Sequence, residues 1–224
     1  MLIPRYFFCG EFSRFYDYFL TQPHLKKQFR KGEYLWQPGQ PHRLFHYIIS
    51  GAAMNYADHE NGRRKIISFH GAGTVFPGYH NCDFKIELSL VTEALSDMQV
   101  LEFTKEQFGQ MFAANAELAQ QVANWHAMYI NRLLFETIHQ EYNSALVKIC
   151  NLLYLLAANN QSAPSGSLDI TQDALAELLG LSRVHITRGL AHLRSRNIIA
   201  TGRGKITVTN LPALAGLCSS ETLA

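Results

Sequence analysis

TQDALAELLGLSRVHITRGLAHLR, residues Thr171–Arg194, decides the fold, because its spacing predicts two short helices joined by a tight turn. Thr171 is a typical N-cap, and apolar residues follow it at helical spacing as far as Leu179. Gly180 ends this helix, since glycine readily adopts the left-handed backbone that follows a helix. After a turn at Leu181-Ser182 a second helix begins. Its apolar residues recur every three or four positions: Ile186, Leu190 and Leu193.

The other faces of the second helix are polar and basic. They carry Arg183, His185, Thr187 and Arg188. Such a helix pair, with donors on the exposed face of its second member, is typical of the helix-turn-helix that reads the DNA major groove. Two amphipathic helices joined at a glycine also occur in helical domains that bind no DNA. The pair alone leaves both interpretations open.

The next segment, Asn197–Val208 (NIIATGRGKITV), favours DNA binding. It predicts a strand, a Gly-Arg-Gly tip and a second strand with period two. A basic hairpin placed directly after a helix-turn-helix is a wing, and Arg203 and Lys205 at its tip can contact phosphates.

Composition bounds the rest of the chain. The 224 residues are 47% hydrophobic, enough for a sizeable core and two domains, and the net charge is only +2. Any affinity for nucleic acid must therefore come from the local basic cluster between Arg183 and Lys205. The start, MLIPRYFFCGEF, lacks the pattern of a signal peptide, and a cytoplasmic location without membrane contact is expected. Cys9, Cys82, Cys150 and Cys218 are scattered, so buried thiols are expected rather than a zinc or iron–sulfur site, with a Cys9–Cys82 redox pair as the alternative.

The N-terminal half alternates short apolar segments with glycine turns. Phe12, Phe15, Tyr16 and Phe19 have helical spacing, which predicts a short packing helix. Strands are expected at Gln28-Phe29, Glu33–Trp36, Leu44–Ile49, Ala52–Tyr56, Lys65–Phe69 and Leu88–Thr92. Asn61-Gly62 marks the clearest hairpin. The pattern predicts an all-β barrel or sandwich.

A long helical region follows the N-cap Thr104. One stripe in it recurs every four or three residues: Leu118, Val122, Trp125, Tyr129 and Leu133. We expect this stripe to form a dimer seam, since a helix-turn-helix that reads a specific site is usually dimeric. The alternative is a core helix packed on the barrel. A further helix, Ser144–Ala157, and a linker, Asn159–Ser167, precede the predicted DNA-binding module.

The whole order resembles the cyclic-AMP receptor protein and fumarate–nitrate reductase regulator (Crp/Fnr) family of bacterial transcription factors. KGEYLWQPGQPHRLFHYIISG (Lys31–Gly51), LAELLGLSRVHITRGLAHLRSRNII (Leu175–Ile199) and GRGKITVTNL (Gly202–Leu211) carry the resemblance. It implies an α+β fold with three parts: a cupin-like, cyclic-nucleotide-binding-like β-roll (1–104), a dimerisation helix (105–140) and a winged helix-turn-helix (141–224). It also implies a homodimer on double-stranded promoter DNA, a small-molecule effector, RNA polymerase as partner, and no enzymatic activity.

The chain departs from the family where cyclic-AMP binders hold the sugar-phosphate. Their Gly-Glu and Arg-Ser pairs correspond here to Gly78-Tyr79 and Leu88-Ser89. A buried phosphodiester without the arginine would be left unpaired, so an effector other than cyclic AMP is expected.

The resemblance places the effector pocket between FPGYHNCDFK (Phe76–Lys85) and the long helix. Its expected lining is Gly78, Tyr79, His80, Asn81, Lys85, Ser89, Trp125, His126 and Tyr129. These side chains suit a small aromatic or carboxylate-bearing molecule, similar to the halogenated-phenol (halorespiration) sensors of the family. No metal or cofactor is expected. The alternatives are haem held by His80, Cys82 or His126 in a gas or redox sensor, and a metal-dependent cupin enzyme using His42, His46, His70 and His80, although the chain has no His-x-His.

In the recognition helix Val184 stands where the cyclic-AMP receptor has glutamate. Valine suits a thymine methyl, which predicts an A·T-shifted half-site. Arg188 is expected to be the strongest base reader and Arg183 to contact a base or a phosphate. Gln172 and Ser182 are expected to anchor the backbone.

Overall fold

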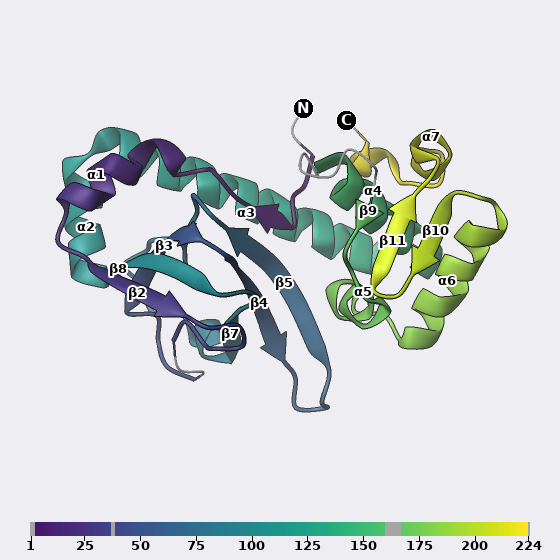
Figure 1. Cartoon of the computed structure of the whole chain (residues 1–224), viewed down its shortest axis with the longest axis horizontal. Coiled ribbons are helices and arrows are strands. Elements are labelled where there is room, and N and C mark those ends of the chain that lie inside the picture. Colours follow the sequence, from purple (N-terminus) through teal and green to yellow (C-terminus); the bar gives the residue numbers. More distant parts are fainter. Residues whose placement is uncertain (1–2, 37–38, 160–166, 224) are drawn as a thin grey trace. The chain divides into compact units, whose positions relative to one another are not determined.

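The structure is a computed structural model that describes residues 3–36, 39–159 and 167–223 (Figure 1). Its contacts divide the chain into two compact units. One contains Tyr6–Arg63 and Ile67–Tyr129, and the other contains Arg64–Ile66 and Ile130 onward, together with the first residues up to Arg5. The boundary at Tyr129 and Ile130 falls inside the long helix, so this helix supplies residues to both units.

A β-roll of two four-stranded sheets, ordered β1-β5-β4-β7 and β2-β8-β3-β6, makes up most of the first unit (Figure 1). The strands are β1 (Phe7–Phe8), β2 (Leu25–Phe29), β3 (Leu44–Ser50), β4 (Ala52–Asp58), β5 (Arg64–Gly71), β6 (Val75–Phe76), β7 (Leu90–Ala94) and β8 (Met98–Thr104). The predicted hairpin at Asn61-Gly62 is confirmed, with Gly62 at φ 77° between β4 and β5.

Two of the strand predictions need correction, and one strand was not predicted. Glu33–Trp36 is not a strand and contributes only one bridge, from Tyr34 to Glu93. Leu88 and Ser89 belong to a 3-10 helix, η2 (Lys85–Ser89), and the strand begins at Leu90. The sequence analysis missed β8, which pairs antiparallel with both β2 and β3. Because β8 is buried on both faces over most of its length, its sequence lacks the alternation that identifies a half-exposed strand.

Aromatic side chains fill the space between the roll and its helices. The predicted N-terminal helix is confirmed as η1 (Ser13–Phe15) and α1 (Tyr16–Thr21), with Phe12, Phe15 and Phe19 buried. Thr104 caps α2 (Lys105–Ala114) as predicted, with its hydroxyl accepting from the Gln107 N–H at 3.2 Å. The Gln107 side chain accepts from the Thr104 N–H at 2.8 Å, which completes a capping box.

The long helix α3 (Ala116–Tyr142) has two different apolar faces. The stripe predicted as a dimer seam is wrong for most of its length, because Leu118, Val122 and Trp125 are buried in the core of the roll unit. Tyr129 is packed against the same core. The alternative interpretation, a core helix, holds for this face.

A second apolar face on α3 is open to solvent. Ile130, Leu134 and Ile138 are 53%, 57% and 48% exposed and follow one another every four residues, so they lie on one side of the helix. Leu133 and Tyr142 flank them and are also exposed. We call Ile130, Leu134 and Ile138 the outer stripe.

The second unit contains the winged helix-turn-helix (Figure 1). Its elements are α4 (Ala145–Asn159), β9 (Ser167–Leu168), α5 (Gln172–Leu179), α6 (Arg183–Ser195), β10 (Ile199–Gly202), β11 (Lys205–Val208), α7 (Leu211–Ala215) and η3 (Ser220–Thr222). Most of the predicted linker lies outside the described residues. A Cβ on Gly189 would lie 2.4 Å from Ile149 Cδ1, so α6 crosses α4 closely and a larger residue there would require the Ile149 side chain to shift.

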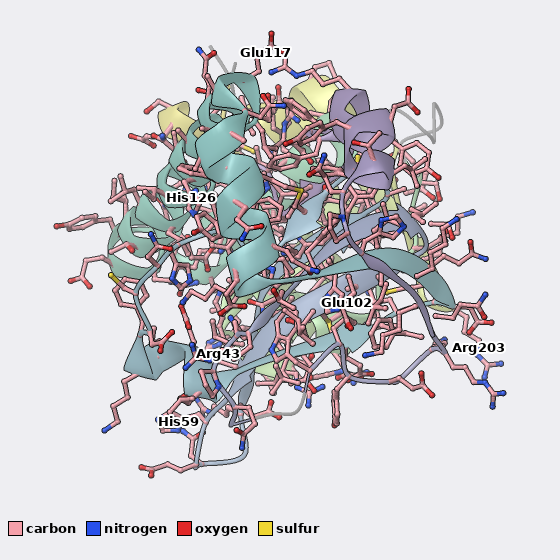
Figure 2. All side chains as sticks on the ribbon, turned by 90° about the vertical axis from the view of Figure 1, so that its left-hand side faces the viewer. Arg43, His59, Glu102, Glu117, His126 and Arg203 are labelled. Atoms are coloured by element: carbon pink, nitrogen blue, oxygen red, sulfur yellow. The ribbon has the colours of Figure 1, made fainter. Side chains whose placement is uncertain are left out.

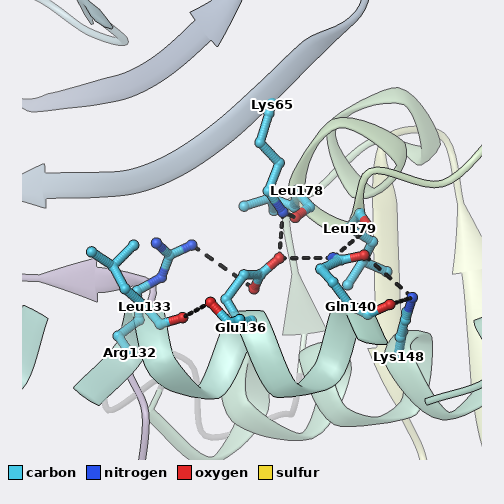
Figure 3. A network of polar contacts seen from close by, with 9 residues as sticks. Lys65, Arg132, Leu133, Glu136, Gln140, Lys148, Leu178 and Leu179 are labelled. Atoms are coloured by element: carbon cyan, nitrogen blue, oxygen red, sulfur yellow. Dashed lines mark hydrogen bonds and ion pairs between the residues drawn. The ribbon is translucent and has the colours of Figure 1, made fainter. Parts of the chain in front are cut away.

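The C-terminal end of α5 is held by side chains from β5 and α3 (Figure 3). Lys65 donates to the Leu178 carbonyl and to the Glu136 carboxylate. Gln140 donates to the Leu179 carbonyl at 2.8 Å and to Glu136 at 2.9 Å. The last carbonyls of a helix have no partner within it, so these contacts satisfy acceptors that would otherwise need water.

The cysteines only partly follow the prediction of buried thiols. None of the four described cysteines forms a disulfide; Cys150 is buried, but Cys9 and Cys82 are exposed. Burial raises the pKa of Cys150 to about 11 and that of Cys218 to about 12, so neither thiol ionises near neutral pH. Of the helices that the structure describes, none has the length and apolar character needed to cross a membrane.

Candidate functional site

The first helix of the motif begins and ends as its sequence predicts. The Thr171 hydroxyl accepts from the Ala174 N–H at 3.1 Å, and Gly180 ends α5 with φ 64°. Leu175, Leu178 and Leu179 are buried, which fixes the apolar face of α5 in the core of the second unit.

The recognition helix α6 begins at Arg183 with Ser182 as its N-cap. The Ser182 hydroxyl accepts from the His185 N–H at 3.4 Å and contacts the His185 ring Nδ1 at 3.1 Å. Ile186, Leu190 and Leu193 are fully buried, as predicted. Ser182 is thus used to start the helix, and backbone anchoring of DNA by Ser182 stays a prediction.

The opposite face of α6 is open. Arg183, Val184, His185, Thr187 and Arg188 are all exposed, and Val184 reaches 55% exposure. Two of these side chains have partners on α5, since Arg183 forms an ion pair with Asp173 and the Thr187 hydroxyl donates to Gln172 Oε1 at 3.1 Å. The pairing of Asp173 with Arg183 was not predicted, because the two residues lie ten positions apart on different helices and their contact gives no local signal.

The wing is confirmed as a hairpin with a two-residue tip. Gly202 pairs with Lys205, and Arg203-Gly204 makes the turn with Gly204 at φ 67°. Arg203 and Lys205 are exposed, and the Arg203 side chain extends away from the ribbon (Figure 2). A third strand, β9, pairs with β11 and was not predicted, since two residues are too short for a periodic signal. The surface formed by α6 and the wing therefore carries exposed arginine and lysine donors.

Part of the predicted effector lining is packed together. A Cβ on Gly78 would lie 2.5 Å from Trp125 Cζ3 and 2.6 Å from His126 Nε2, so the backbone of this loop rests directly on α3. The Tyr79 ring packs 5.1 Å from that of Phe112, and its hydroxyl donates to Asn81 at 2.6 Å. These contacts pack the loop from Gly78 to Asn81 against α3 and the neighbouring aromatic ring, and we call it the closed loop.

The two rings predicted from α3 stack on each other. Trp125 and Tyr129 have ring centres 5.1 Å apart, and Phe8 of β1 packs against both at 5.7 and 5.5 Å. The Tyr129 hydroxyl lies 3.2 Å from that of Ser68. Phe8 was not predicted to lie here, because a two-residue strand gives no periodic signal, and its stacking on His70 was not predicted either. Trp125 and Tyr129, together with Phe8 and His70, therefore make the interior beside α3 aromatic.

Of the remaining predicted effector residues, the two histidines contact groups that are close to them in the sequence. His80 contacts Glu87 at 2.9 Å through Nε2 and the Cys82 carbonyl at 2.6 Å through Nδ1. His126 projects from α3 (Figure 2), and its Nδ1 contacts the Val122 carbonyl at 2.9 Å. Burial lowers the pKa of His126, which favours its neutral form. Lys85 and Ser89 are exposed on η2.

The histidines named in the haem and metal alternatives contact other groups of the chain. Both ring nitrogens of His80 face oxygen acceptors, from Glu87 and from the Cys82 carbonyl. His46 Nε2 contacts Glu102 at 2.9 Å and His70 Nε2 contacts Ser68 at 2.9 Å. Within the described part of the chain, no three His, Cys, Asp or Glu side chains are grouped so that they could hold a metal ion.

Comparison with known proteins matches both parts of the chain. Residues 147–217 match the Crp-like helix-turn-helix domain, and residues 26–115 match the cyclic nucleotide-binding domain. The chain belongs to the Crp/Fnr family. It is accordingly a DNA-binding transcriptional regulator with a cyclic-nucleotide-binding-like domain, as the sequence predicted.

Its relatives in the family differ in what they regulate and respond to. It is 27% identical to the global nitrogen regulator of Synechocystis sp., covering 86% of this chain and 88% of the relative. It is 25% identical to the cAMP-activated global transcriptional regulator CRP of Haemophilus influenzae, covering 82% of this chain and 83% of that one. These identities establish the class of regulator but do not identify its effector.

Solved structures share the fold. FixK2 from Bradyrhizobium japonicum aligns with a TM-score of 0.74 at 19% identity, covering 88% of this chain and 98% of that one. CprK complexed with OCPA aligns with a TM-score of 0.73 at 16% identity, covering 95% of this chain and 100% of that one. Because the two scores are so close, structural similarity does not select the halogenated-phenol branch that the sequence analysis favoured.

Proposed function

We propose that this regulator acts as a homodimer that binds a two-fold symmetric, A·T-shifted promoter site in the cytoplasm. The observation that carries this proposal is the open face of α6. Ile186, Leu190 and Leu193 fix the helix in the core, while Val184 and Arg188 face solvent in its first two turns. An arginine there can form two hydrogen bonds to guanine, and a valine can contact a thymine methyl.

The outer stripe of α3 supports the dimer. Three large aliphatic side chains on one helical face, each about half exposed, are unfavourable in water and suit burial against the same face of a second copy. A symmetric pair would present two recognition helices about one DNA turn apart, roughly 34 Å. RNA polymerase is the expected further partner, recruited or blocked at the promoter.

Selection of duplexes from a randomised library by the full-length protein tests this proposal. We expect enriched sequences to contain two inverted half-sites whose centres are about 10 base pairs apart, each with A·T pairs beside one guanine contact. Sedimentation of the free protein should give the mass of two chains. Enrichment of a single half-site, or of no sequence, would contradict the proposal.

We propose further that the effector is a small aromatic acid rather than cyclic AMP. The residues around Trp125, Tyr129 and Tyr79 offer ring faces, and Leu88 stands at the position of the phosphate-binding arginine and is 42% exposed. An effector entering here must separate Gly78 from α3, which links its binding to movement of this loop.

Thermal unfolding with added ligands tests the effector class. We expect a halogenated phenylacetate to raise the unfolding temperature and cyclic AMP to leave it unchanged. A shift with cyclic AMP alone would contradict the proposal, and a Soret band after haem loading would favour the gas-sensor alternative instead.

A further inference from the structure

Two polar contacts join the first turn of α5 to the recognition helix. The Asp173 carboxylate pairs with the Arg183 guanidinium, and Gln172 accepts a hydrogen bond from Thr187 at 3.1 Å. Asp173 and Arg183 are 64% and 59% exposed, so the ion pair lies at the surface that α6 presents to solvent. A negative charge on a surface that approaches phosphates opposes binding, and its presence there needs a reason.

The stability that the ion pair adds to the fold does not explain why a carboxylate lies on this surface. An ion pair this exposed stabilises a protein by about 0–1 kcal/mol, because water and salt screen it. An acidic residue in the first turn also interacts favourably with the helix dipole. That interaction accounts for a carboxylate at Asp173, but it requires no arginine beside it.

The geometry restrains one DNA-contacting arginine without blocking it. Arginine has five N–H donors, and Asp173 engages Nη1 of Arg183, which leaves other N–H groups of the guanidinium for a base edge. Restraint before binding reduces the side-chain entropy that is lost when the complex forms. The carboxylate also repels phosphates, so it disfavours the alternative pose in which Arg183 turns to the DNA backbone.

We propose that Asp173 is a positioning residue that sets DNA specificity through Arg183. It holds the guanidinium toward the bases and withholds it from the phosphates. This inference rests on the proposed function, because it requires that α6 reads a specific site. It adds a residue on α5, outside the recognition helix, to those that determine which promoter is bound.

Removing the carboxylate should therefore act in opposite directions on two kinds of DNA. On random duplex, Arg183 becomes free to contact a phosphate, so affinity rises and the slope of log K against log salt steepens by about 0.9. On the selected site, the base contact loses its alignment. The ratio of specific to random affinity should fall about tenfold, within the range for one base contact.

Asp173→Asn, which keeps the shape and removes the charge, tests the inference in the full-length protein. The probes are the duplex enriched by the wild-type protein and a random duplex of equal length, each titrated at several salt concentrations. Asp169→Asn is the matched control, since Asp169 is an exposed carboxylate just before the N-cap Thr171. We expect the control to change both affinities by the same small factor and to leave their ratio unchanged.

A double-mutant cycle with Arg183→Ala identifies the route of the effect. In the Arg183→Ala background, Asp173→Asn should leave the specificity ratio unchanged. An equal fall in both backgrounds, or no fall in either, would overturn the inference. Asp173→Glu should restore part of the ratio, and circular dichroism melts should show that the variants remain folded.

Failure of the inference is distinguishable from failure of the proposed function. If the wild-type protein binds selected and random duplexes equally, then the proposed function fails before any variant is measured. If the wild-type protein discriminates and Asp173→Asn discriminates equally well, only the role of Asp173 is wrong.

Discussion

The recognition helix and the loop Gly78–Asn81 differ in what their side chains already contact. On α6, the side chains of Val184 and Arg188 face solvent. In the loop, Gly78 rests on Trp125 and Tyr79 is packed among aromatic rings. The outer stripe of α3 belongs with the open surfaces. The difference teaches that, under the proposed function, DNA and a second copy meet side chains that are already exposed, whereas an effector must first separate Gly78 from Trp125.

The open outer stripe gives the largest expected effect. Leu134→Asp should raise the dissociation constant of the dimer about a thousandfold, since the charge enters the interface twice and each central contact contributes roughly 2 kcal/mol. Sedimentation equilibrium measures the change. Leu211→Asp, at an exposed leucine on α7, is the control and should leave the mass of the dimer unchanged.

In the roll unit, which contains the closed loop Gly78–Asn81, a fall in pH should destabilise the fold through His42. Burial, followed by the charges of His80 and Lys105, lowers the pKa of His42 from 6.5 to about 4. The neutral ring is thus favoured in the folded state, so the stabilisation is complete above pH 6.5 and is lost as the pH falls toward 4.

The expected loss from His42 is about 3 kcal/mol of unfolding free energy between pH 7 and 4. His42→Phe, which keeps a ring against Trp36, should show a correspondingly smaller decrease in denaturant titrations at the two pH values. His59→Gln, at an exposed histidine, should behave as wild type. Parallel curves for wild type and His42→Phe would show that His42 is not the titrating group.

On the open side, Arg188→Ala should weaken binding to the selected duplex by about 1–3 kcal/mol and relax one base position. Affinity for random duplex should change much less. Arg194→Ala, in the last turn of the same helix and bonded to Thr201, is the control. An equal loss on both duplexes would make Arg188 a phosphate contact instead.

The smallest effect is expected at Gly78. Gly78→Ala places a methyl group against Trp125 and His126, which should lower the free energy of unfolding by about 1–2 kcal/mol through overpacking. Gly202→Ala is the control, because the nearest neighbour of an added Cβ, Lys205 Cβ, is 3.9 Å away. Unchanged stability would mean that the loop and α3 separate easily.

The sequence predicts the open surface better than the closed one, for a physical reason. Caps, a left-handed glycine and a 3.6-residue period are local signals, and Thr171, Gly180 and Ile186 occupy the places they predict. Packing between distant segments has no local signal. Neither the stacking of Phe8 on His70 nor the direction of Trp125, which turns into the core rather than toward a second copy, follows from spacing along the chain.

The contacts of Lys65 and Gln140 with the last carbonyls of α5 predict where mutations that alter DNA binding should occur. Helix α5 has only eight residues, and Lys65 and Gln140 fix the end that leads into α6. We expect substitutions at these two positions to change the pose of the recognition helix without touching a base. A screen for altered promoter occupancy should therefore recover residues from β5 and α3 alongside those of the recognition helix.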